Sequence, residues 1–305
     1  MSAITHVLAG TDLSAISSDA VDRGFRIAQS TGARYTILYA VGIDAAISLR
    51  DMLGDEAEAV TARLLEDARQ RLARQASDSA NAGTVTADLR VARGPVAKEI
   101  PDCIRETGVD LVVVGAHGGG FLQRMLLGST ASRLIRESKV PVLVVKQRAR
   151  HDYARVLVAV DFSPASASCV RLARELAPGA EMVLLHVFNV PFEGQMQYAG
   201  VSPDIIHEYR VKTRERLVRH MGEFAASAGL RRDDYIGLVV HGDAAPRHRA
   251  RDRYRSDRVV MGKHGTHVTE ELLLGSVTRR VLAESTGDVL VVVDERRPNI
   301  SDVSP

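Results

Sequence analysis

The sequence is poor in the residues that mark several specialised protein classes. It has no tryptophan and two cysteines, Cys103 and Cys169, which stand in unrelated contexts without CxxC or Cys/His spacing. Neither a disulfide framework nor a structural zinc site is therefore predicted, and both thiols are interpreted as reduced core residues. No apolar run approaches the roughly 20 residues that cross a bilayer, and residues 1–12 lack the basic and apolar parts of a signal peptide. We expect a cytoplasmic protein without a membrane segment.

An excess of charge of one sign is also missing. The chain has 40 basic and 38 acidic residues and a net charge of +2, which argues against a nucleic-acid partner. The local exception is an arginine run from Arg247 to Arg258, interrupted by Asp252 and Asp257. Two interpretations of this run remain open: a solvated irregular segment, or a surface that binds an anion or a partner.

Length and composition are those of an ordinary folded chain. The 305 residues are 45% hydrophobic and 26% charged. This composition excludes a disordered or collagenous protein. The length favours two domains of roughly 150 residues or one large α/β domain.

The sequence repeats itself. Gly115-Ala-His-Gly, followed by Gly128-Ser, recurs as Gly262-Lys-His-Gly, followed by Gly275-Ser, at a constant offset of 147 residues. The surroundings repeat as well, from Asp110-Leu-Val-Val-Val to Asp257-Arg-Val-Val-Met. Such a sustained register indicates a tandem duplication. We place the domains at residues 1–147 and 153–295, followed by a polar tail at 296–305.

Short runs of Val, Ile and Leu alternate with longer segments of helical periodicity in each half, a pattern typical of strands buried on both faces. The predicted strands are residues 4–9, 35–41, 86–91, 111–114 and 142–145, and then 156–160, 182–187, 236–240, 258–261 and 289–293. Helices are predicted at residues 15–31, 56–80, 96–107 and 129–137. The expected fold class is α/β, with two tandem Rossmann-like domains. Each is a five-stranded parallel sheet of order 3-2-1-4-5 with helices on both faces.

The notable polar residues and glycines fall at two strand ends. For this strand order the ligand crevice lies beyond the carboxyl ends of strands 1 and 4, where Asp12 and the glycine motif stand. Glycines let backbone N–H groups approach phosphate oxygens, and Ser129 starts the next helix at its electropositive end. The pattern predicts an anion cradle in each half. Two structural alternatives remain: the glycines only shape a turn, and Asp12 and Asp161 cap the following helices.

With these residues the chain resembles the universal stress protein family, from about residue 4 to residue 294. The shared motif is G-x2-G-x9-G-S/T, accompanied by the strand-1 aspartate and by a glycine turn after strand 3, here Gly94 and Gly242. The resemblance implies an adenine-nucleotide-binding fold and a set of nucleotide-binding residues. In the first half these are Asp12, Val41, Gly115, His117, Gly118, Gly128 and Ser129. In the second half they are Asp161, Val187, Gly262, His264, Gly265, Gly275 and Ser276.

The same resemblance implies ATP or another adenine nucleotide, with magnesium in some members, and a regulatory or protective role in stress response. The duplication also suggests an internal pseudo-dimer of the two halves. The last strand of each half, at residues 142–145 and 289–293, is a candidate packing edge. Pairing of whole chains into a homodimer is compatible with this arrangement. The segments 42–54 and 189–202, with Met196 as an exposed residue, are candidate contacts for an unidentified protein partner.

The second half departs from the first at two places. Its segment after strand 3 contains Pro246 and most of the arginine run, so a short or poorly packed helix is expected and the completeness of the second site is open. Inside the motif, Lys263 replaces Ala116. A solvent-facing lysine is the favoured interpretation, and one that reaches a phosphate is the alternative.

Enzyme motifs are missing. The sequence contains no GxSxG elbow, no HExxH and no Walker A pattern. His264, His267 and Glu270 have a metal-ligand spacing, but the first half does not repeat it, so no metal site is predicted. Two alternatives to a nucleotide-binding regulator remain: a nucleotide-free interaction module, and a slow ATP hydrolase or autophosphorylating protein.

Overall fold

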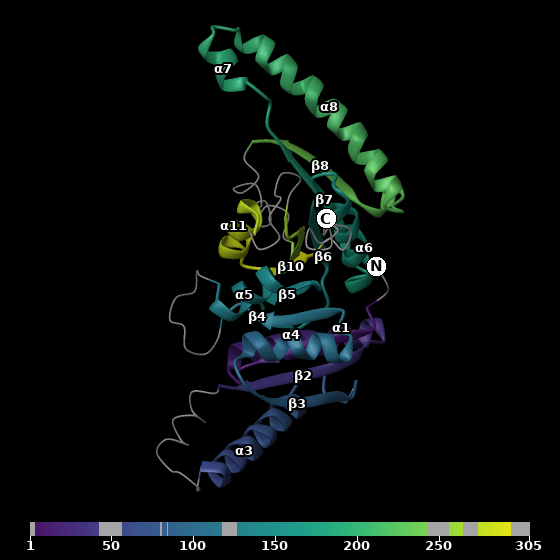
Figure 1. Cartoon of the computed structure of the whole chain (residues 1–305). Coiled ribbons are helices and arrows are strands. Elements are labelled where there is room, and N and C mark those ends of the chain that lie inside the picture. Colours follow the sequence, from purple (N-terminus) through teal and green to yellow (C-terminus); the bar gives the residue numbers. More distant parts are fainter. Residues whose placement is uncertain are drawn as a thin grey trace, which may run out of the picture. The chain divides into compact units, whose positions relative to one another are not determined.

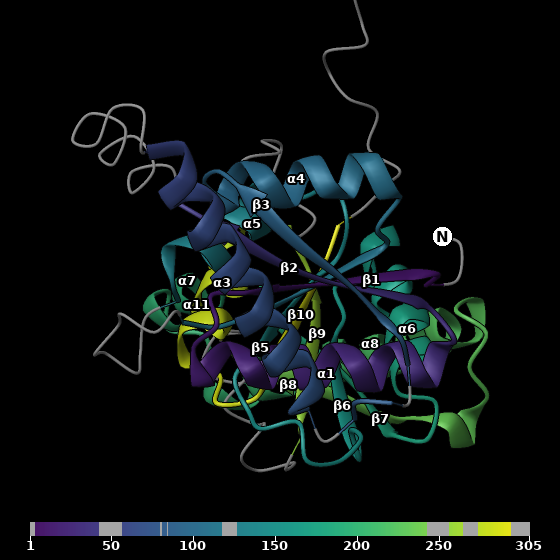
Figure 2. The ribbon, with the colours of Figure 1, turned by 90° about the horizontal axis from the view of Figure 1, so that it is seen from below.

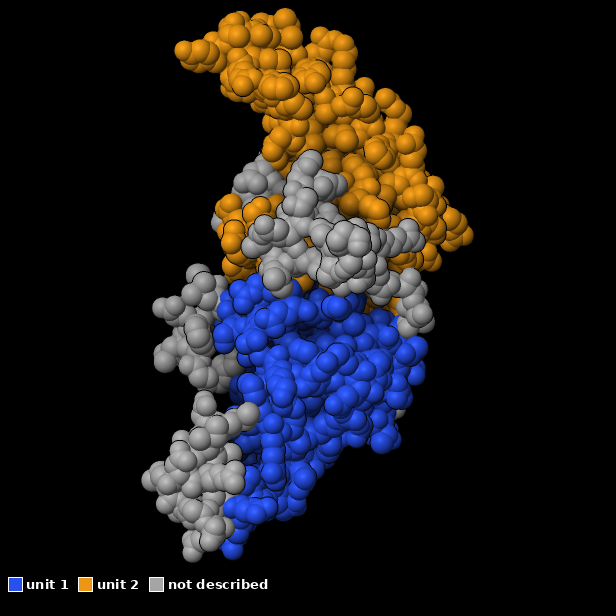
Figure 3. Space-filling model, viewed as in Figure 1, with its two compact units in different colours: residues 1–152, 286–291 blue, residues 153–285, 292–305 orange. Residues whose placement is uncertain are grey.

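A computed structural model describes residues 4–42, 57–79, 81–83, 85–117, 127–242, 256–264 and 274–293. The chain divides into two compact units (Figure 3). The first unit contains residues 1–152 and 286–291, and the second contains residues 153–285 and 292–305. Most of the last strand of the chain therefore belongs to the first unit.

The first unit contains six neighbouring strands in the order β3-β2-β1-β4-β5-β10 (Figure 1). Its strands are β1 (His6–Thr11), β2 (Arg34–Val41), β3 (Ala87–Arg93), β4 (Leu111–Gly115), β5 (Val142–Val145) and β10 (Asp288–Val292). The first five are parallel to their neighbours, which confirms the predicted order 3-2-1-4-5. β10 is antiparallel to β5, with Leu290 opposite Leu143, so the two candidate packing edges pair with each other.

The second unit repeats this topology. Its strands are β6 (Arg155–Ala159), β7 (Glu181–Phe188), β8 (Ile236–His241) and β9 (Arg258–Gly262), in the parallel order β9-β6-β7-β8. After β9, the backbone N–H of Lys263 donates to the carbonyl of Val292 at 2.8 Å, just as Ala116 donates to Val145 after β4 at 2.9 Å. β10 thus holds in the second repeat the place that β5 holds in the first, and the predicted order is found in both.

Helices join the parallel strands. They are α1 (Ala15–Thr31), α3 (Ala57–Ser77), α4 (Val96–Thr107) and α5 (Ser129–Glu137) in the first unit, and α6 (Pro164–Leu176), α7 (Glu193–Tyr198), α8 (Pro203–Ser227), the 3-10 turn η2 (Arg232–Asp234) and α11 (Ser276–Glu284) in the second. α1 lies on one face of the first sheet and α4 on the opposite face (Figure 2). The first unit is doubly wound, as predicted. Among the described residues, no helix combines the length and the apolar character that a membrane crossing requires.

An aspartate before strand 4 holds the start of strand 1 in both repeats. Asp110 Oδ2 accepts the backbone N–H groups of Thr5 and His6 at 2.8 and 3.0 Å. Asp257 Oδ2 accepts the two N–H groups at the start of β6 at 2.7 and 3.0 Å. This duplicated contact positions strands 1 and 4 side by side, and their carboxyl ends form the crevice described below.

Three sequence expectations need correction. The segment 189–202 is not a loop throughout, because it contains α7, and Met196 on that helix is half-buried. Arg258, the last member of the arginine run, is fully buried, so it is neither solvated nor part of a binding surface. Its guanidinium stacks 4.3 Å from the centroid of the Tyr153 ring and donates to the carbonyl of Ala173 at 3.3 Å. The other arginines of the run lie outside the described residues.

Candidate functional site

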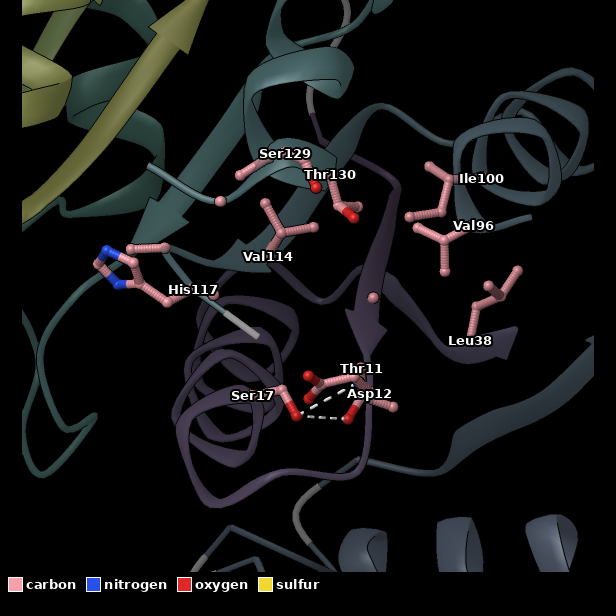
Figure 4. Close-up of a pocket in the computed structure, with 15 residues that line it drawn as sticks. Thr11, Asp12, Ser17, Leu38, Val96, Ile100, Val114, His117, Ser129 and Thr130 are labelled. Carbon is pink, nitrogen blue, oxygen red and sulfur yellow. Dashed lines mark hydrogen bonds between the residues drawn. The ribbon is translucent and has the colours of Figure 1, made fainter. Parts of the chain in front are cut away.

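A cavity of about 270 Å³ opens in the first unit beyond the carboxyl ends of β1 and β4 (Figure 4). This is the crevice at which strand order reverses, where doubly wound sheets bind ligands. The lining residues come from β1, β2 and β4, from the turns after β1 and β4, and from α1, α4 and α5. They are Gly10, Thr11, Asp12, Ser17, Leu38, Val96, Ile100, Val114, Gly115, Ala116, His117, Gly128, Ser129, Thr130 and Ala131.

One side of the cavity is apolar. Leu38 of β2, Val96 and Ile100 of α4 and Val114 of β4 contribute hydrocarbon side chains there (Figure 4). Gly10 makes this wall compact, because a Cβ atom at that position would lie 3.0 Å from Ile100 Cδ1. A flat apolar group, such as an aromatic base, fits between such side chains.

Other lining residues contribute polar groups, from the backbone and from small side chains. β4 ends at Gly115, and just before α5 begins the backbone N–H of Gly128 donates to the carbonyl of Ala116 at 2.8 Å. Gly128 is the N-cap of α5 and makes no side-chain capping hydrogen bond. Ser129 and Thr130 then begin the helix at the cavity wall. The first N–H groups of a helix lack intrahelical partners and carry a positive partial charge, which favours an anion such as a phosphate.

His117 directly follows Ala116 after β4 and also lines the cavity. Its Nε2 is a buried nitrogen for which the described part of the chain supplies no hydrogen-bond partner. A buried nitrogen without a partner is costly unless a ligand or water satisfies it. A bound phosphate or hydroxyl group would supply the missing hydrogen-bond partner of this nitrogen.

Asp12 lies in the turn between β1 and α1. Leu13 has a positive φ of 62°, and Asp12 Oδ1 accepts the backbone N–H of Ser14 at 3.0 Å. Ser14 is the N-cap, since its side chain accepts the N–H of Ser17. The alternative that Asp12 caps the helix is therefore wrong: Asp12 orders the turn before the cap and places a carboxylate at the cavity wall.

Most of the residues predicted to form the first-half site lie around one cavity in the structure. Asp12, Gly115, His117, Gly128 and Ser129 all line the cavity. Val41 does not line it, although Leu38, three residues earlier on the same strand, does. Gly118 lies outside the described residues. That these residues bind a nucleotide stays a prediction.

Sequence reasoning missed several lining residues. Val96 and Ile100 belong to the helix predicted at residues 96–107, and nothing in the motif pointed to them as part of the site. Thr11 and Ser17 belong to no motif that the sequence analysis identified. Their only sequence signal was their place on either side of Asp12, at the end of a strand and in the first turn of a helix.

The second unit brings the corresponding residues to the ends of β6 and β9. Asp161 follows β6, Gly262 ends β9, Gly275 is the N-cap of α11 and Ser276 is its first residue. Ser163 is the N-cap of α6, which corrects the capping alternative for Asp161 as well. His264 follows Lys263, and Gly265 lies outside the described residues.

The residue equivalent to Val41 is Phe188 and not Val187. Gly94 donates its N–H to the carbonyl of Val41 at 3.0 Å, and Gly242 makes the same bond with Phe188 at 3.0 Å. Val187 thus stands one residue before the expected position, so its side chain points to the other face of the strand. Both glycines have the positive φ expected of the turn, 154° and 128°.

Lys263 is not solvent-facing, and that interpretation is wrong. Only 6% of its surface is exposed, because it takes the place of Ala116, whose side chain is also buried. The backbone N–H of Gly275 donates to the carbonyl of Lys263 at 3.2 Å, the counterpart of the bond from Gly128 to Ala116 in the first unit. The motif of the second unit thus places a lysine where the first has a methyl group.

Aromatic and imidazole rings gather beside Asp161. Phe162, which has a positive φ of 64°, lies parallel to the His220 ring with centroids 4.3 Å apart, and its centroid is 4.4 Å from that of His186. His186 Nδ1 lies 2.8 Å from the carbonyl oxygen of Val160. Burial lowers the pKa of His186 below its ordinary value of 6.5, so this imidazole is neutral at pH 7. The first unit has Leu13 in place of Phe162.

Metal ligands do not cluster in the part of the chain that the structure describes. No group of three or more His, Cys, Asp or Glu side chains there could hold an ion. His267 and Glu270 lie outside the described residues.

Comparison with known proteins identifies relatives of both halves. The profile of the universal stress protein family matches residues 3–146 and again residues 152–293. A universal stress protein of Mycolicibacterium smegmatis is 30% identical over 304 residues, which cover 94% of this chain and 96% of that protein. Another, from Mycobacterium tuberculosis, is 27% identical over 230 residues, covering 72% of this chain and 69% of that protein.

A solved structure shows the same fold. A universal stress protein from Archaeoglobus fulgidus superposes with a TM-score of 0.64 and 19% sequence identity. The match covers 94% of this chain and 98% of that one. The tandem α/β arrangement is therefore shared along nearly the whole length.

Proposed function

The chain belongs to the universal stress protein family, and on that premise we propose that the cavity of the first unit binds ATP or another adenine nucleotide. The observation that carries this proposal is the division of the cavity into two chemically different sides. Leu38, Val96 and Ile100 offer an apolar slot for a base, and the N-terminus of α5 offers N–H groups for phosphates. Asp12 also lines the cavity, and its carboxylate can accept ribose hydroxyls.

Magnesium would enter with the phosphates. The described residues of the cavity contribute one carboxylate, that of Asp12, and no cluster of ligands for an ion. A divalent ion in this proposal is therefore coordinated mainly by phosphate oxygens and water, which is how Mg²⁺ commonly binds.

The proposed role is regulatory or protective in stress response. Nucleotide occupancy would set the conformation of the protein or its choice of a protein partner in the cytoplasm. The two predicted domains, residues 1–147 and 153–295, would each contribute one candidate site, and whole chains could pair as homodimers. A second cradle at Asp161, Gly262, Gly275 and Ser276 belongs to this proposal.

The first test is direct identification of a bound nucleotide. Purified full-length protein is denatured, and any released small molecule is identified by chromatography and mass spectrometry and expressed as moles per chain. About two equivalents would support both sites and about one would support a single competent half. Absence of a nucleotide, followed by no calorimetric binding of Mg-ATP, would leave the interaction module as the better account.

Replacing Ser129 by aspartate tests the assigned phosphate side. Ser129 is exposed and is the first residue of α5, where a carboxylate stabilises the helix but repels a phosphate in the cavity. We expect Ser129→Asp to keep the fold and to weaken ATP binding at least tenfold, about 1.4 kcal/mol, with a smaller effect on adenosine. The measurement is isothermal titration calorimetry with ATP and adenosine.

Ser132→Asp is the matched control. Ser132 lies in the first two turns of the same helix but does not line the cavity, so its replacement introduces the same charge away from the ligand. Equal weakening of ATP binding by both substitutions would contradict the assignment of the phosphate side, because a general charge effect would explain both.

A further inference from the structure

We propose that the crevices of the two units differ in the ligand they admit: Ala159 and Met261 keep a purine base out of the second one, so that only the first unit binds a complete nucleotide. The inference rests on the proposed function, since it concerns which part of the nucleotide each crevice can hold. It starts from a comparison of the two repeats at the positions that line the cavity of the first unit.

The motif positions of the cavity carry the same residues in both repeats. Asp12, Gly115, His117, Gly128 and Ser129 correspond to Asp161, Gly262, His264, Gly275 and Ser276. The structure supports this register, because Gly115 and Gly262 end β4 and β9, while Gly128 and Gly275 are the N-caps of α5 and α11. Both crevices therefore keep the helix start that the proposed function assigns to phosphates.

The two central strands differ where they border the crevice. In the first unit Gly10 of β1 lies opposite Val114 of β4, and both residues line the cavity. In the second unit Val158 lies opposite Val260 in the same way, so the next pair along the strands is Ala159 and Met261. These residues stand at the positions of Gly10 and Val114, and equivalent strand positions direct their side chains to the same face.

The two pairs are alternative ways to fill the same space. A Cβ atom at Gly10 would lie 3.0 Å from Ile100 Cδ1 and 3.3 Å from Val114 Cγ1, closer than such carbons normally approach. The glycine therefore leaves the space beside the branched valine open. Methionine has no branch at Cβ, so it leaves room for the methyl group that Ala159 adds.

Met261 has a longer side chain than Val114 and is no more exposed. The exposed fraction is 4% for Met261 and 5% for Val114. The additional length of the methionine is therefore not directed into solvent and takes up space inside the second unit. A base that entered beside this strand end would have to displace the methionine and give up its packing contacts.

The comparison concerns the strands, because the counterparts of Val96 and Ile100 lie outside the described residues. The difference between the repeats affects the apolar groups that would contact a base, and it leaves Gly275 and Ser276 at the start of α11 as they are. The second crevice should thus discriminate against the nucleoside part of a ligand and not against its phosphates.

The test counts bound ligand on the full-length chain by isothermal titration calorimetry. The probes are Mg-ATP and inorganic triphosphate, which carries the phosphates without the nucleoside. We expect the wild-type chain to bind about one ATP, and the opening variant Ala159→Gly, Met261→Val to bind about two. The closing variant Gly10→Ala, Val114→Met should bind ATP at least about tenfold more weakly than the wild type. Neither double variant should change the binding of inorganic triphosphate.

Val113→Met is the matched control. Val113 precedes Val114 on β4, is fully buried and does not line the cavity, because its side chain points to the other face of the strand. It makes the same replacement on the same strand and should leave ATP affinity unchanged. Urea unfolding of every variant, followed by circular dichroism, shows that binding is measured on folded protein.

Each outcome decides the proposal. If the wild-type chain binds two ATP molecules with equal affinity, or the opening variant binds no more ATP than the wild type, the selective role of Ala159 and Met261 is overturned. Equal loss of ATP and inorganic triphosphate in the closing variant would overturn it too, since the loss would then not concern the base. In these cases the nucleotide site of the first unit stands. If the wild-type chain binds no ATP, the proposed function fails, and this inference falls with it.

Discussion

Single residues decide how the first helix of each unit packs on its sheet. In the first unit the ring of Tyr35 lies against Gly24 of α1, and its hydroxyl donates to the carbonyl of Val21 at 2.7 Å. In the second unit the equivalent pair is Ala173 and Met182, both buried. A small residue thus accompanies the large ring, and a larger one accompanies the flexible side chain.

Gly24→Ala should therefore destabilise the protein, although alanine favours helices. The new Cβ would lie 2.4 Å from the Tyr35 hydroxyl oxygen, so the ring would have to move. We expect a loss of about 1 to 3 kcal/mol in the free energy of unfolding, typical of overpacking, despite a gain of about 1 kcal/mol in helix propensity. Urea unfolding followed by circular dichroism measures it.

The double variant Gly24→Ala, Tyr35→Met recreates the pair of the second unit. In the Tyr35→Met background, Gly24→Ala should cost much less unfolding free energy than it costs in the wild-type protein. Strict additivity of the two changes would show that the glycine and the ring are not coupled.

At the residue scale, local sequence was enough to place some residues at the cavity, whereas the position of others depends on long-range pairing. Asp12, Gly115 and Ser129 were chosen for their places at strand and helix ends and line the cavity. That they bind a nucleotide stays a prediction. Val187 was predicted to be the second-half equivalent of Val41, which is wrong by one residue, because only the strand pairing shows that Phe188 is the equivalent position. The side chain of Lys263 was expected in solvent because lysine is rarely buried, yet its backbone position is the buried one of Ala116.

Helices were the elements best predicted from sequence. α1, α4 and α5 have the expected bounds, because the residues at helix ends and the apolar periodicity are local signals: Ser14 caps the start of α1, and Gly32 and Gly108 end α1 and α4. Strand ends were less accurate: β1 was expected to begin at Ile4 and begins at His6. The contacts of the Asp110 carboxylate fix that start, and nothing in the local sequence reports them.

The attachment of β10 depends on a buried carboxylate. Asp288 at its start is fully buried, accepts the backbone N–H groups of Lys146 and Gln147 at 2.8 and 3.1 Å, and pairs with Arg23 of α1 at 3.4 Å. One side chain thus connects three segments of the first unit. Asp288→Ala would remove this carboxylate from a buried arginine and from two backbone donors.

We expect Asp288→Ala to cost about 3 to 5 kcal/mol of unfolding free energy and to speed hydrogen exchange in β5 and β10. The matched control is Asp152→Ala, which removes an exposed carboxylate, 84% accessible, from Arg26 and should cost less than about 1 kcal/mol. Urea unfolding and hydrogen-exchange mass spectrometry report both quantities. Similar costs for the two substitutions would argue against a special role of the buried pair.

At the scale of the whole chain, the first unit takes its sixth strand from the far end of the sequence. β5 and β10 both contain Val-Leu-Val-Val and pair antiparallel about Leu143 and Leu290. The second repeat therefore supplies to β5 the same edge that another copy of β5 would supply. Without it, β5 would be an unprotected, apolar edge strand.

A fragment of residues 1–152 should therefore dimerise through β5. We expect it to sediment as a dimer at micromolar concentration, because the exposed strand can pair with its own copy. The control is the same fragment extended through a flexible linker by residues 286–293, which should be monomeric and more stable to urea. A monomeric 1–152 fragment with the stability of the extended one would contradict this account.

The sequence by itself determined the duplication, the α/β class, the strand order and the strand ends at which the cavity lies. These follow from local patterns, since periodicity, glycine spacing and helix caps act over a few residues, and the repeat sets both halves in one register. Only the tertiary structure decided that β10 joins the first unit and that Lys263 is buried. Each of these depends on which segments meet in space, where burial and competition for hydrogen-bond partners select one contact among several that the sequence allows.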